Sequence, residues 1–415
     1  MEAAGGPDRS TIGLCLSGGG FRASFYALGV LRYLAEAGTL ERVSSISAVS
    51  GGSIMAAAVA DRWTDFQRAG GDVQAFVDKI DKPFRGTVTS KNLRRRWMIG
   101  SVAGVVPFTG GRGGAYARAL ANNLYTHDRV ADLPKSPEFI FTSTDMTKGR
   151  AFRVAPGFTG SWDYGYVEPT PTSIGLGTAV AASAAFPPAL TVVNLKTKDL
   201  GFPKAAPPPA LSLVDGGVYD NLGLEWFQGD REDEKSVRPK AAADEPACTI
   251  VANASGLFED KDKRFWSLGS LGRDLSIQYQ QSLNVRIRWW VEKLKAGHNG
   301  VYLAIKTDPR KEPRLDPAVD AAALPSELVK PLAKLRTDLD RFSSDEADLL
   351  SYHGYWTLHG RLRMYAPDLA IANPAWTQYA GLSASDTERL RKLLELGSHR
   401  FFRGVRSRLP FGLGG

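Results

Sequence analysis

The sequence predicts an α/β protein with a mostly parallel, doubly wound sheet and a mainly helical C-terminal part. Three observations carry this prediction. Short apolar runs alternate with helical patterns from the start of the chain, glycine-rich turns join the first runs to the helices after them, and helical spacing dominates beyond about residue 260. Alternation of strand and helix is typical of a parallel sheet covered by helices.

The first two strand–turn–helix units lie close together. Residues 12–16 and 43–49 are apolar runs of strand length, and the residues that follow each run, 25–34 and 54–59, have apolar side chains at helical spacing. Gly38 is placed to end the first helix. Two consecutive units of this kind predict neighbouring parallel strands.

Later segments extend the pattern with less regularity. Further strands are expected at 139–144, at 211–214 and at 249–252, the last clear core strand, and a short helix of small residues at 179–185. Segments 196–209 and 229–246 are predicted to be a loop and a charged insertion, and 308–325 a connector. Helices are expected at 275–294, 349–364 and 387–402. We therefore expect a core over residues 10–260 and a mainly helical extension over 261–415 that packs on it.

Composition sets broad limits on function. The apolar content is 43%, the charged content is 23%, and the 52 basic and 44 acidic residues give a net charge of +8. This mild excess is compatible with an ordinary soluble surface, or, if clustered, with an anionic partner such as a phospholipid headgroup surface or a nucleotide; no nucleic-acid polymer is expected. Only Cys15 and Cys248 are present, which favours a reducing compartment. With no secretory signal pattern and no apolar run long enough to span a bilayer, we expect a cytoplasmic protein whose membrane contact is peripheral.

One turn carries a candidate nucleophile. Ser50 follows the predicted strand 43–49, with Gly51 and Gly52 behind it and Ala48 two positions before it. Small residues on both sides are what a sharp strand-to-helix elbow requires, and such an elbow exposes a serine hydroxyl for attack. The first small position is usually glycine, so Ala48 is a departure. On its own this pattern is more often only a structural turn.

A second turn is a candidate anion cradle. Gly18, Gly19 and Gly20 precede a predicted helix, so their N–H groups can point into one cavity and receive negative charge. A nucleotide phosphate loop would need Lys-Ser or Lys-Thr after the glycines, where Phe21-Arg22 stands, and a dinucleotide fingerprint fits poorly. We therefore interpret the glycines as an oxyanion hole. Arg22 either pairs with a substrate phosphate or carboxylate, or has a structural role.

A third turn supplies a carboxylate. Asp215 ends the predicted strand 211–214 and precedes Gly216 and Gly217, which allow its carboxylate to approach another loop. None of the histidines ends a convincing core strand; they are His127, His298, His353, His359 and His399. The sequence thus shows no Ser-His-Asp relay and no metal-ligand cluster, whereas a Ser–Asp pair is present.

The glycine cradle, the serine elbow and the Asp-Gly-Gly turn, in this order, resemble the patatin-like phospholipases. Segments 142–145, 183–187 and 215–221 also resemble motifs of that family, as does, more weakly, the segment 352–355. Both Gly18–Ala23 and Val49–Ser53 are also similar to the corresponding turns of cytosolic phospholipases A2. The recognisable motifs cover about residues 10–255.

The resemblance implies a three-layer α/β/α sandwich and a metal-independent reaction without a cofactor. Ser50 would attack an ester carbonyl, and Asp215 would accept the serine proton and later donate it to the leaving alcohol. The amides of Gly18, Gly19 and Gly20 would hold the tetrahedral oxyanion. The implied activity is release of fatty acid from glycerophospholipids at a membrane surface. Alternatives with the same dyad are a lysophospholipase, a neutral-lipid esterase or a thioesterase. A further alternative is a membrane-degrading effector that a ligand or partner protein switches on. A catalytically silent lipid-binding protein is less favoured because the dyad is intact.

Two segments combine basic and aromatic residues and are candidates for lipid contact. These are Arg94–Trp97, followed by the apolar run 99–108, and Arg286–Trp290 with Lys293. In the second segment Ile287 and Trp290 equally fit the apolar face of a core helix, with the arginines in solvent. The region 90–114 is also a candidate lid over the site. The sequence does not indicate the acyl position cleaved, the oligomeric state or an activating signal.

Overall fold

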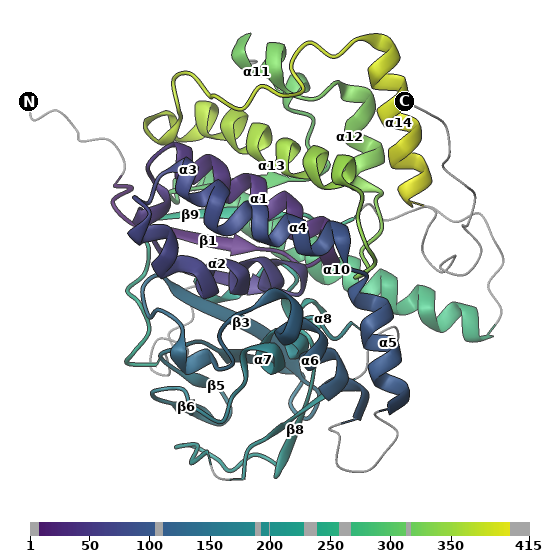
Figure 1. Cartoon of the computed structure of the whole chain (residues 1–415). Coiled ribbons are helices and arrows are strands. Elements are labelled where there is room, and N and C mark those ends of the chain that lie inside the picture. Colours follow the sequence, from purple (N-terminus) through teal and green to yellow (C-terminus); the bar gives the residue numbers. More distant parts are fainter. Residues whose placement is uncertain are drawn as a thin grey trace, which may run out of the picture.

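A mixed sheet forms the centre of the protein (Figure 1). The computed structural model describes residues 8–103, 111–186, 192–198, 200–227, 239–256, 267–312 and 317–398. Within these ranges the strand order is β10-β9-β1-β2-β3-β4-β5-β6, while β8 pairs with β3 and β7 pairs with β8. The strands are β1 (Ile12–Leu16), β2 (Val43–Val49), β3 (Glu138–Asp145), β4 (Arg150–Val154), β5 (Thr159–Ser161), β6 (Gly165–Val167), β7 (Val193–Lys196), β8 (Ala210–Asp215), β9 (Cys248–Asn253) and β10 (Gly300–Ala304).

Helices cover both faces of this sheet. They are α1 (Gly20–Glu36), α2 (Gly51–Arg68), α3 (Val73–Phe76), α4 (Lys82–Ser90), α5 (Leu93–Ala103), α6 (Gly111–Leu124), α7 (Leu176–Ser183), α8 (Gly217–Asp220), α10 (Ser267–Lys295), α11 (Pro317–Ala322), α12 (Ser326–Ala333), α13 (Ser344–Tyr365) and α14 (Ala384–Ser398). Short 3₁₀ or π turns connect several of them.

The parallel part of the sheet places the two glycine turns beside each other. Strand β2 pairs in parallel with both β1 and β3, and β1 pairs in parallel with β9. The carboxyl ends of parallel strands lie at one edge of a sheet. The loop after β1, which holds the glycines, is therefore a neighbour of the turn after β2, which holds Ser50.

Alternation along β1 shows the three layers. Leu14 and Leu16 pack in the large core with the residues of α1, α2 and α13, whereas Cys15 packs on the other face with Leu283 and Trp290 of α10. Successive side chains of a strand point to opposite faces, so this division follows from the strand itself. The expected α/β/α sandwich with a mostly parallel sheet is confirmed, and Figure 1 shows α1 and α2 lying across one face of it.

The C-terminal helix α13 packs closely on α1. A Cβ atom on Gly29 would lie 1.7 Å from the carbonyl oxygen of Ser351, and one on Gly354 would lie 2.2 Å from that of Tyr26. Glycines on both helices thus let the two backbones touch. Figure 1 shows the two helices side by side, so α13 belongs to the same packed body as the N-terminal half.

Three features differ from expectation. Strand 249–252 was predicted to be the last core strand, but β10 follows it and pairs in parallel with β9, where it extends the sheet. The sequence also did not indicate the short antiparallel strands β4 to β6, and β7 overlaps the start of the predicted loop 196–209. The division into a core over residues 10–260 and an extension over 261–415 stays a prediction. The sheet crosses this boundary because β10 lies in the extension.

Candidate active site

Ser50 occupies a strained elbow between β2 and α2. Its backbone angles are φ 53° and ψ −119°, and it is the one non-glycine residue with positive φ in the described part of the chain. Such a conformation costs about 1–3 kcal/mol and persists only where the surroundings enforce it. The serine is 8% exposed. The predicted elbow is therefore present, with the serine at its apex.

The glycines after Ser50 bring the elbow against the glycine loop. A Cβ on Gly51 would lie 2.0 Å from the carbonyl oxygen of Gly20, and one on Gly52 would lie 2.2 Å from that of Leu16. Larger residues would push the two turns apart. Gly51 and Gly52 thus explain how Ser50 comes to lie beside the loop that follows β1.

Asp215 stands at the end of β8, opposite Ser143 of β3. Its Oδ1 accepts a hydrogen bond of 2.7 Å from the amide of Gly217, whereas its buried Oδ2 has no hydrogen bond within the usual distance limit from any described residue. Burial raises the pKa of Asp215 to about 7, although the nearby Ser50 hydroxyl and the Gly217 amide act in the opposite direction. The carboxyl group thus has a proton affinity suited to a base at neutral pH.

The three predicted oxyanion glycines do not have the same environment. The N–H of Gly18 donates to the carbonyl oxygen of Asn221 at 3.0 Å, so it is already used. Gly19 and Gly20 have φ values of 138° and 58°, and within the described residues their amides have no hydrogen-bond acceptor. The oxyanion role of all three amides stays a prediction; for Gly18 it requires this bond to break, whereas the amides of Gly19 and Gly20 have no such bond to lose.

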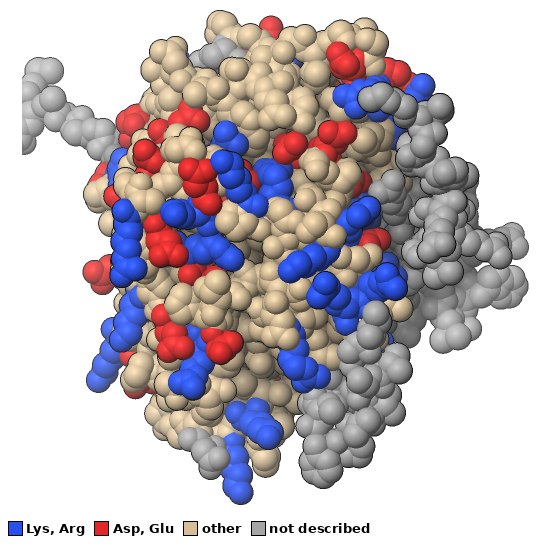
Figure 2. Space-filling view, in the orientation of Figure 1, with Lys and Arg blue, Asp and Glu red and all other residues tan. Residues whose placement is uncertain are grey.

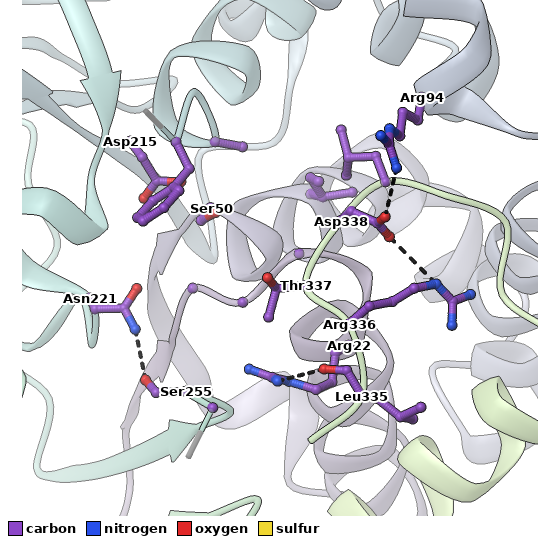
Figure 3. A pocket seen from close by; sticks show the side chains of 18 of the residues that line it. Arg22, Ser50, Arg94, Asp215, Asn221, Ser255, Leu335, Arg336, Thr337 and Asp338 are labelled. Carbon is purple, nitrogen blue, oxygen red and sulfur yellow. Dashed lines mark hydrogen bonds and ion pairs between the residues drawn. The ribbon is translucent and has the colours of Figure 1, made fainter. Parts of the chain in front are cut away.

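These groups line one cavity of about 730 Å³ (Figure 3). Asp215, Ser50 and Asn221 lie along one side, with Asn221 donating from Nδ2 to Ser255 Oγ at 2.7 Å. Residues 333–339, which we call the strap, form the opposite side. The apolar part of the lining includes Ile54, Trp97, Met98, Tyr116, Phe186 and Leu339. The sequence analysis did not single out Ser255, although Gly256 follows it, nor the strap, which contains no glycine.

Positive charge predominates in the lining. Among the described residues, six basic side chains and two acidic ones line the cavity: Arg22, Arg94, Arg112, Arg273, Lys334 and Arg336, with Asp215 and Asp338. Asp338 pairs with Arg94 at 3.2 Å and with Arg336 at 3.5 Å. On the face shown in Figure 2, Lys and Arg side chains gather over α5 with few acidic ones among them. The cavity therefore attracts anions.

Arg22 connects the strap to the core. Its NH1 donates to the carbonyl oxygens of Ala333 and Leu335 at 3.1 and 2.8 Å, and its NH2 donates to that of Ala254 at 3.0 Å. The side chain is buried, and burial lowers its pKa to about 10. Contact between Arg22 and a substrate stays a prediction. Of the two roles that the sequence left open, these three hydrogen bonds favour the structural one.

The histidines lie away from the dyad. None of the four in the described ranges lines the cavity, and His399 lies outside those ranges. His127 Nδ1 contacts Asp61, His359 Nδ1 contacts Tyr33, and burial lowers the pKa of His353 to about 4. Structural roles explain these three residues.

The two candidate lipid-contact segments differ. Trp290 is 1% exposed and packs in the core, Trp289 is half-buried against the same cluster, and Arg286 lies 3.5 Å from Asp220, so most of the aromatic part of the second segment packs inside the protein. In the first, Arg95 and Arg96 are exposed, whereas Trp97 is buried and its indole donates to Arg112 O at 3.2 Å. Residues 104–108 of this segment and 229–238 of the charged insertion lie outside the described residues. A lid role for 90–114 stays a prediction.

Comparison with known proteins shows to which family the chain belongs. The family model described as "Patatin-like phospholipase" matches residues 14–226, which contain Ser50 and Asp215. The chain therefore belongs to the patatin-like phospholipase family. No curated protein matched the chain.

Solved structures with a similar fold include human GIVD cytosolic phospholipase A2, at 12% identity and a TM-score of 0.48. The match covers 93% of this chain and 63% of that one, so this chain spans less than two thirds of its length. VipD from Legionella pneumophila is similar at 12% identity and a TM-score of 0.34, over 86% of this chain and 68% of that one.

The described residues contain no group of three or more His, Cys, Asp or Glu side chains arranged to hold a metal ion. Nor does any helix among them combine the length and the apolar character that crossing a bilayer requires.

Proposed function

We propose that this protein is a lipid acyl hydrolase that cleaves fatty-acyl esters of glycerophospholipids at a membrane surface with a Ser50–Asp215 dyad. One observation carries the proposal. A serine at a strained elbow lies beside a buried carboxyl group whose pKa is raised to about 7, in a cavity that also holds the available amides of Gly19 and Gly20.

The proposed reaction has two halves. Ser50 Oγ bonds to the ester carbonyl carbon while its proton passes to Asp215, and the amides of Gly19 and Gly20 stabilise the resulting oxyanion. As the intermediate collapses, the ester C–O bond breaks and Asp215 returns the proton to the leaving alcohol. Water then gives a proton to the same carboxylate and bonds to the acyl carbon; the C–Oγ bond breaks, Asp215 returns the proton to Ser50 Oγ, and the fatty acid is released. No metal or cofactor is required in this sequence of steps.

Charge supports a phospholipid as the substrate. The basic lining of the cavity complements a phosphodiester, and the apolar side chains of Ile54, Met98 and Phe186 suit an acyl chain. Met98 and Phe186 are 51% and 44% exposed, so apolar surface continues from the cavity to the outside, beside the basic start of α5. We propose that this edge of the molecule contacts anionic lipid surfaces from the cytoplasmic side.

Fatty-acid release from anionic phospholipid vesicles without added metal tests the proposal. Ser50→Ala and Asp215→Asn are expected to remove release, with Ser47→Ala as the matched control because the Ser47 hydroxyl is buried without a hydrogen-bond partner in the described structure. Because Asp215 must be deprotonated to accept a proton, activity is expected to rise with pH around a midpoint near 7. Release that survives Ser50→Ala would contradict the mechanism.

Parallel assays separate the other substrates and modes of action. Faster cleavage of a lysophospholipid, a neutral glyceride or an acyl thioester than of the diacyl phospholipid would reassign the substrate while keeping the dyad. Activity that appears only after a cell extract or nucleotide is added, together with a change in oligomeric state, would favour a ligand-activated effector.

A further inference from the structure

The backbone amide of the proposed nucleophile is held by a second serine. The N–H of Ser50 donates to Ser183 Oγ at 3.1 Å. Ser183 is the last residue of α7 and is fully buried, so its hydroxyl cannot reach a substrate. The bond acts on the residue whose φ of 53° needs support from its surroundings.

All hydrogen-bonding positions of the Ser183 hydroxyl are used. It donates its one hydrogen to the carbonyl oxygen of Thr142 at 2.5 Å. A hydroxyl has one donor and two acceptor sites, so the 2.8 Å contact with Ser53 Oγ must have Ser53 as the donor. Together with the bond from Ser50, this gives three partners in three directions. The hydroxyl therefore cannot rotate without losing a buried hydrogen bond.

The main chain around Ser183 holds the other member of the dyad. The amide of Gly216 donates to the carbonyl oxygen of Ser183, and the amide of Asp215 donates to that of Ala185, each at 3.1 Å. Residues 183–185 thus contact both Ser50 and Asp215, which come from the ends of β2 and β8. The segment 183–185, at the end of α7, therefore sets the separation between nucleophile and base.

We propose that Ser183 is a positioning residue that aligns Ser50 with Asp215, an inference that rests on the dyad of the proposed function. Its hydroxyl links the elbow to β3 through Thr142, and its carbonyl links the same point to the Asp215 turn. Removal of the hydroxyl leaves the buried Ser50 amide and Ser53 hydroxyl without this acceptor. The elbow then loses the bond that holds the nucleophile toward its base, while the cavity walls that bind the substrate stay in place.

A fluorescent alkyl fluorophosphonate tests this without a lipid substrate. In its reaction the Ser50 Oγ–P bond forms, the P–F bond breaks, fluoride leaves, and the hydroxyl proton passes to Asp215. The maximal labelling rate, kinact, reports alignment, and the half-saturating concentration, KI, reports binding. Ser183→Ala is expected to lower kinact by about 10- to 100-fold and to leave KI unchanged. The reason is that leaving a buried polar group without its hydrogen-bond partner is expected to slow the reaction by about one to two powers of ten.

Three further variants make the result specific. Ser183→Thr keeps the hydroxyl and is expected to recover most of the rate. Ser183→Cys keeps the shape but offers a weak acceptor, so it should fold and give an intermediate rate even if Ser183→Ala does not fold. Ser45→Ala is the matched control, since the Ser45 hydroxyl is fully buried on β2 and has no partner among the described residues.

The outcomes separate this proposal from the one it rests on. Equal kinact values for wild type and Ser183→Ala, or a lower melting temperature with unchanged kinact, would overturn the positioning role and leave the dyad intact. Absence of labelling in the wild type, or labelling that survives Ser50→Ala, would overturn the dyad and the positioning role together. Loss of kinact in the Ala variant with recovery in the Thr variant would support it.

Discussion

The cavity has two sides that differ in how the chain builds them. On one side, the ends of β1, β2 and β8 carry the glycine loop, Ser50 and Asp215, and main-chain hydrogen bonds and close glycine contacts fix each group. On the other side lies the strap, which belongs to the C-terminal part of the chain and meets the first side through Arg22 and the backbone of Gly20.

The two sides of the cavity are expected to differ in how well they tolerate amino-acid substitutions. The dyad side depends on backbone conformation, so its sequence requirement is for small residues at fixed places. The strap is held by hydrogen bonds from Arg22 to its carbonyl oxygens, while the side chains it presents to the cavity include the partly exposed ion pair of Asp338 with Arg94, which tolerates more change. Chemistry is therefore expected to be sensitive on the first side, and binding and selectivity on the second.

The largest expected effect comes from Asp215→Asn, which should have opposite consequences for activity and stability. Activity should fall by at least about 10²-fold because the base is lost. Burial raises the pKa of Asp215 from 3.8 to about 7, so the folded protein binds a proton more tightly than the unfolded chain, and its stability falls as pH rises through this range. Asparagine does not ionise, so the variant should be more stable than wild type by up to about 4 kcal/mol at pH 8 and similar to it at pH 3.5. Urea unfolding at both pH values measures this, and an equal difference at the two would contradict it.

Gly20→Ala tests whether the strap presses on the glycine loop. Gly20 has a φ of 58°, and a Cβ there would lie 1.9 Å from the carbonyl oxygen of Thr337. Gly38 is the matched control, because its φ is 63° and nothing lies within 4 Å of its Cβ position. Gly38→Ala should cost about 1 kcal/mol of stability, for the backbone alone, whereas Gly20→Ala should cost about 3 kcal/mol and reduce activity. Equal losses in the two variants would show that the strap moves freely.

The same contrast explains how much the sequence could predict. Ser50 and Asp215 stand in turns whose small residues are visible locally, and each turn follows an apolar strand, so each was a candidate; their placement in one site was implied by the resemblance of the three turns to the patatin-like phospholipases. The strap has no such mark. Its contact with the loop depends on how α13 packs against α1 through Gly29 and Gly354, and a contact between distant segments leaves no periodic signal.

Two other features were hidden for related reasons. The bond from Gly18 to Asn221 depends on the path of the chain after Asp215, which spacing alone does not give. Strand β10 is short and follows a long helix, so a five-residue run was not distinguishable from the surrounding helical pattern. Element types were thus predictable for the first two strand–turn–helix units and for the long C-terminal helices, but not for the short strands β4 to β6 and β10, and contacts between distant segments were not predictable.

Arg22→Lys tests whether this residue belongs to the strap contact or to the substrate. Lysine keeps the charge but cannot hold three carbonyl oxygens at once, so stability should fall by about 2 kcal/mol. If the role is structural, cleavage of a neutral short-chain ester and of an anionic phospholipid should decrease by the same factor. A loss confined to the phospholipid, with unchanged stability, would instead assign Arg22 to the substrate phosphate.

Asp338→Asn should give the smallest effect and one confined to the strap side. The change removes an acidic group that pairs with Arg94 and Arg336, at a cost in stability below about 1 kcal/mol because Arg94 and Asp338 are partly exposed. It makes the cavity more positive by one charge, so binding to anionic vesicles should tighten by at most about fivefold at low salt and return to the wild-type value at high salt. Asp345→Asn makes the same charge change at a residue outside the cavity lining and is the matched control. Vesicle co-sedimentation at two salt concentrations measures the difference, and tighter binding by both variants would assign the effect to net charge instead of to the strap.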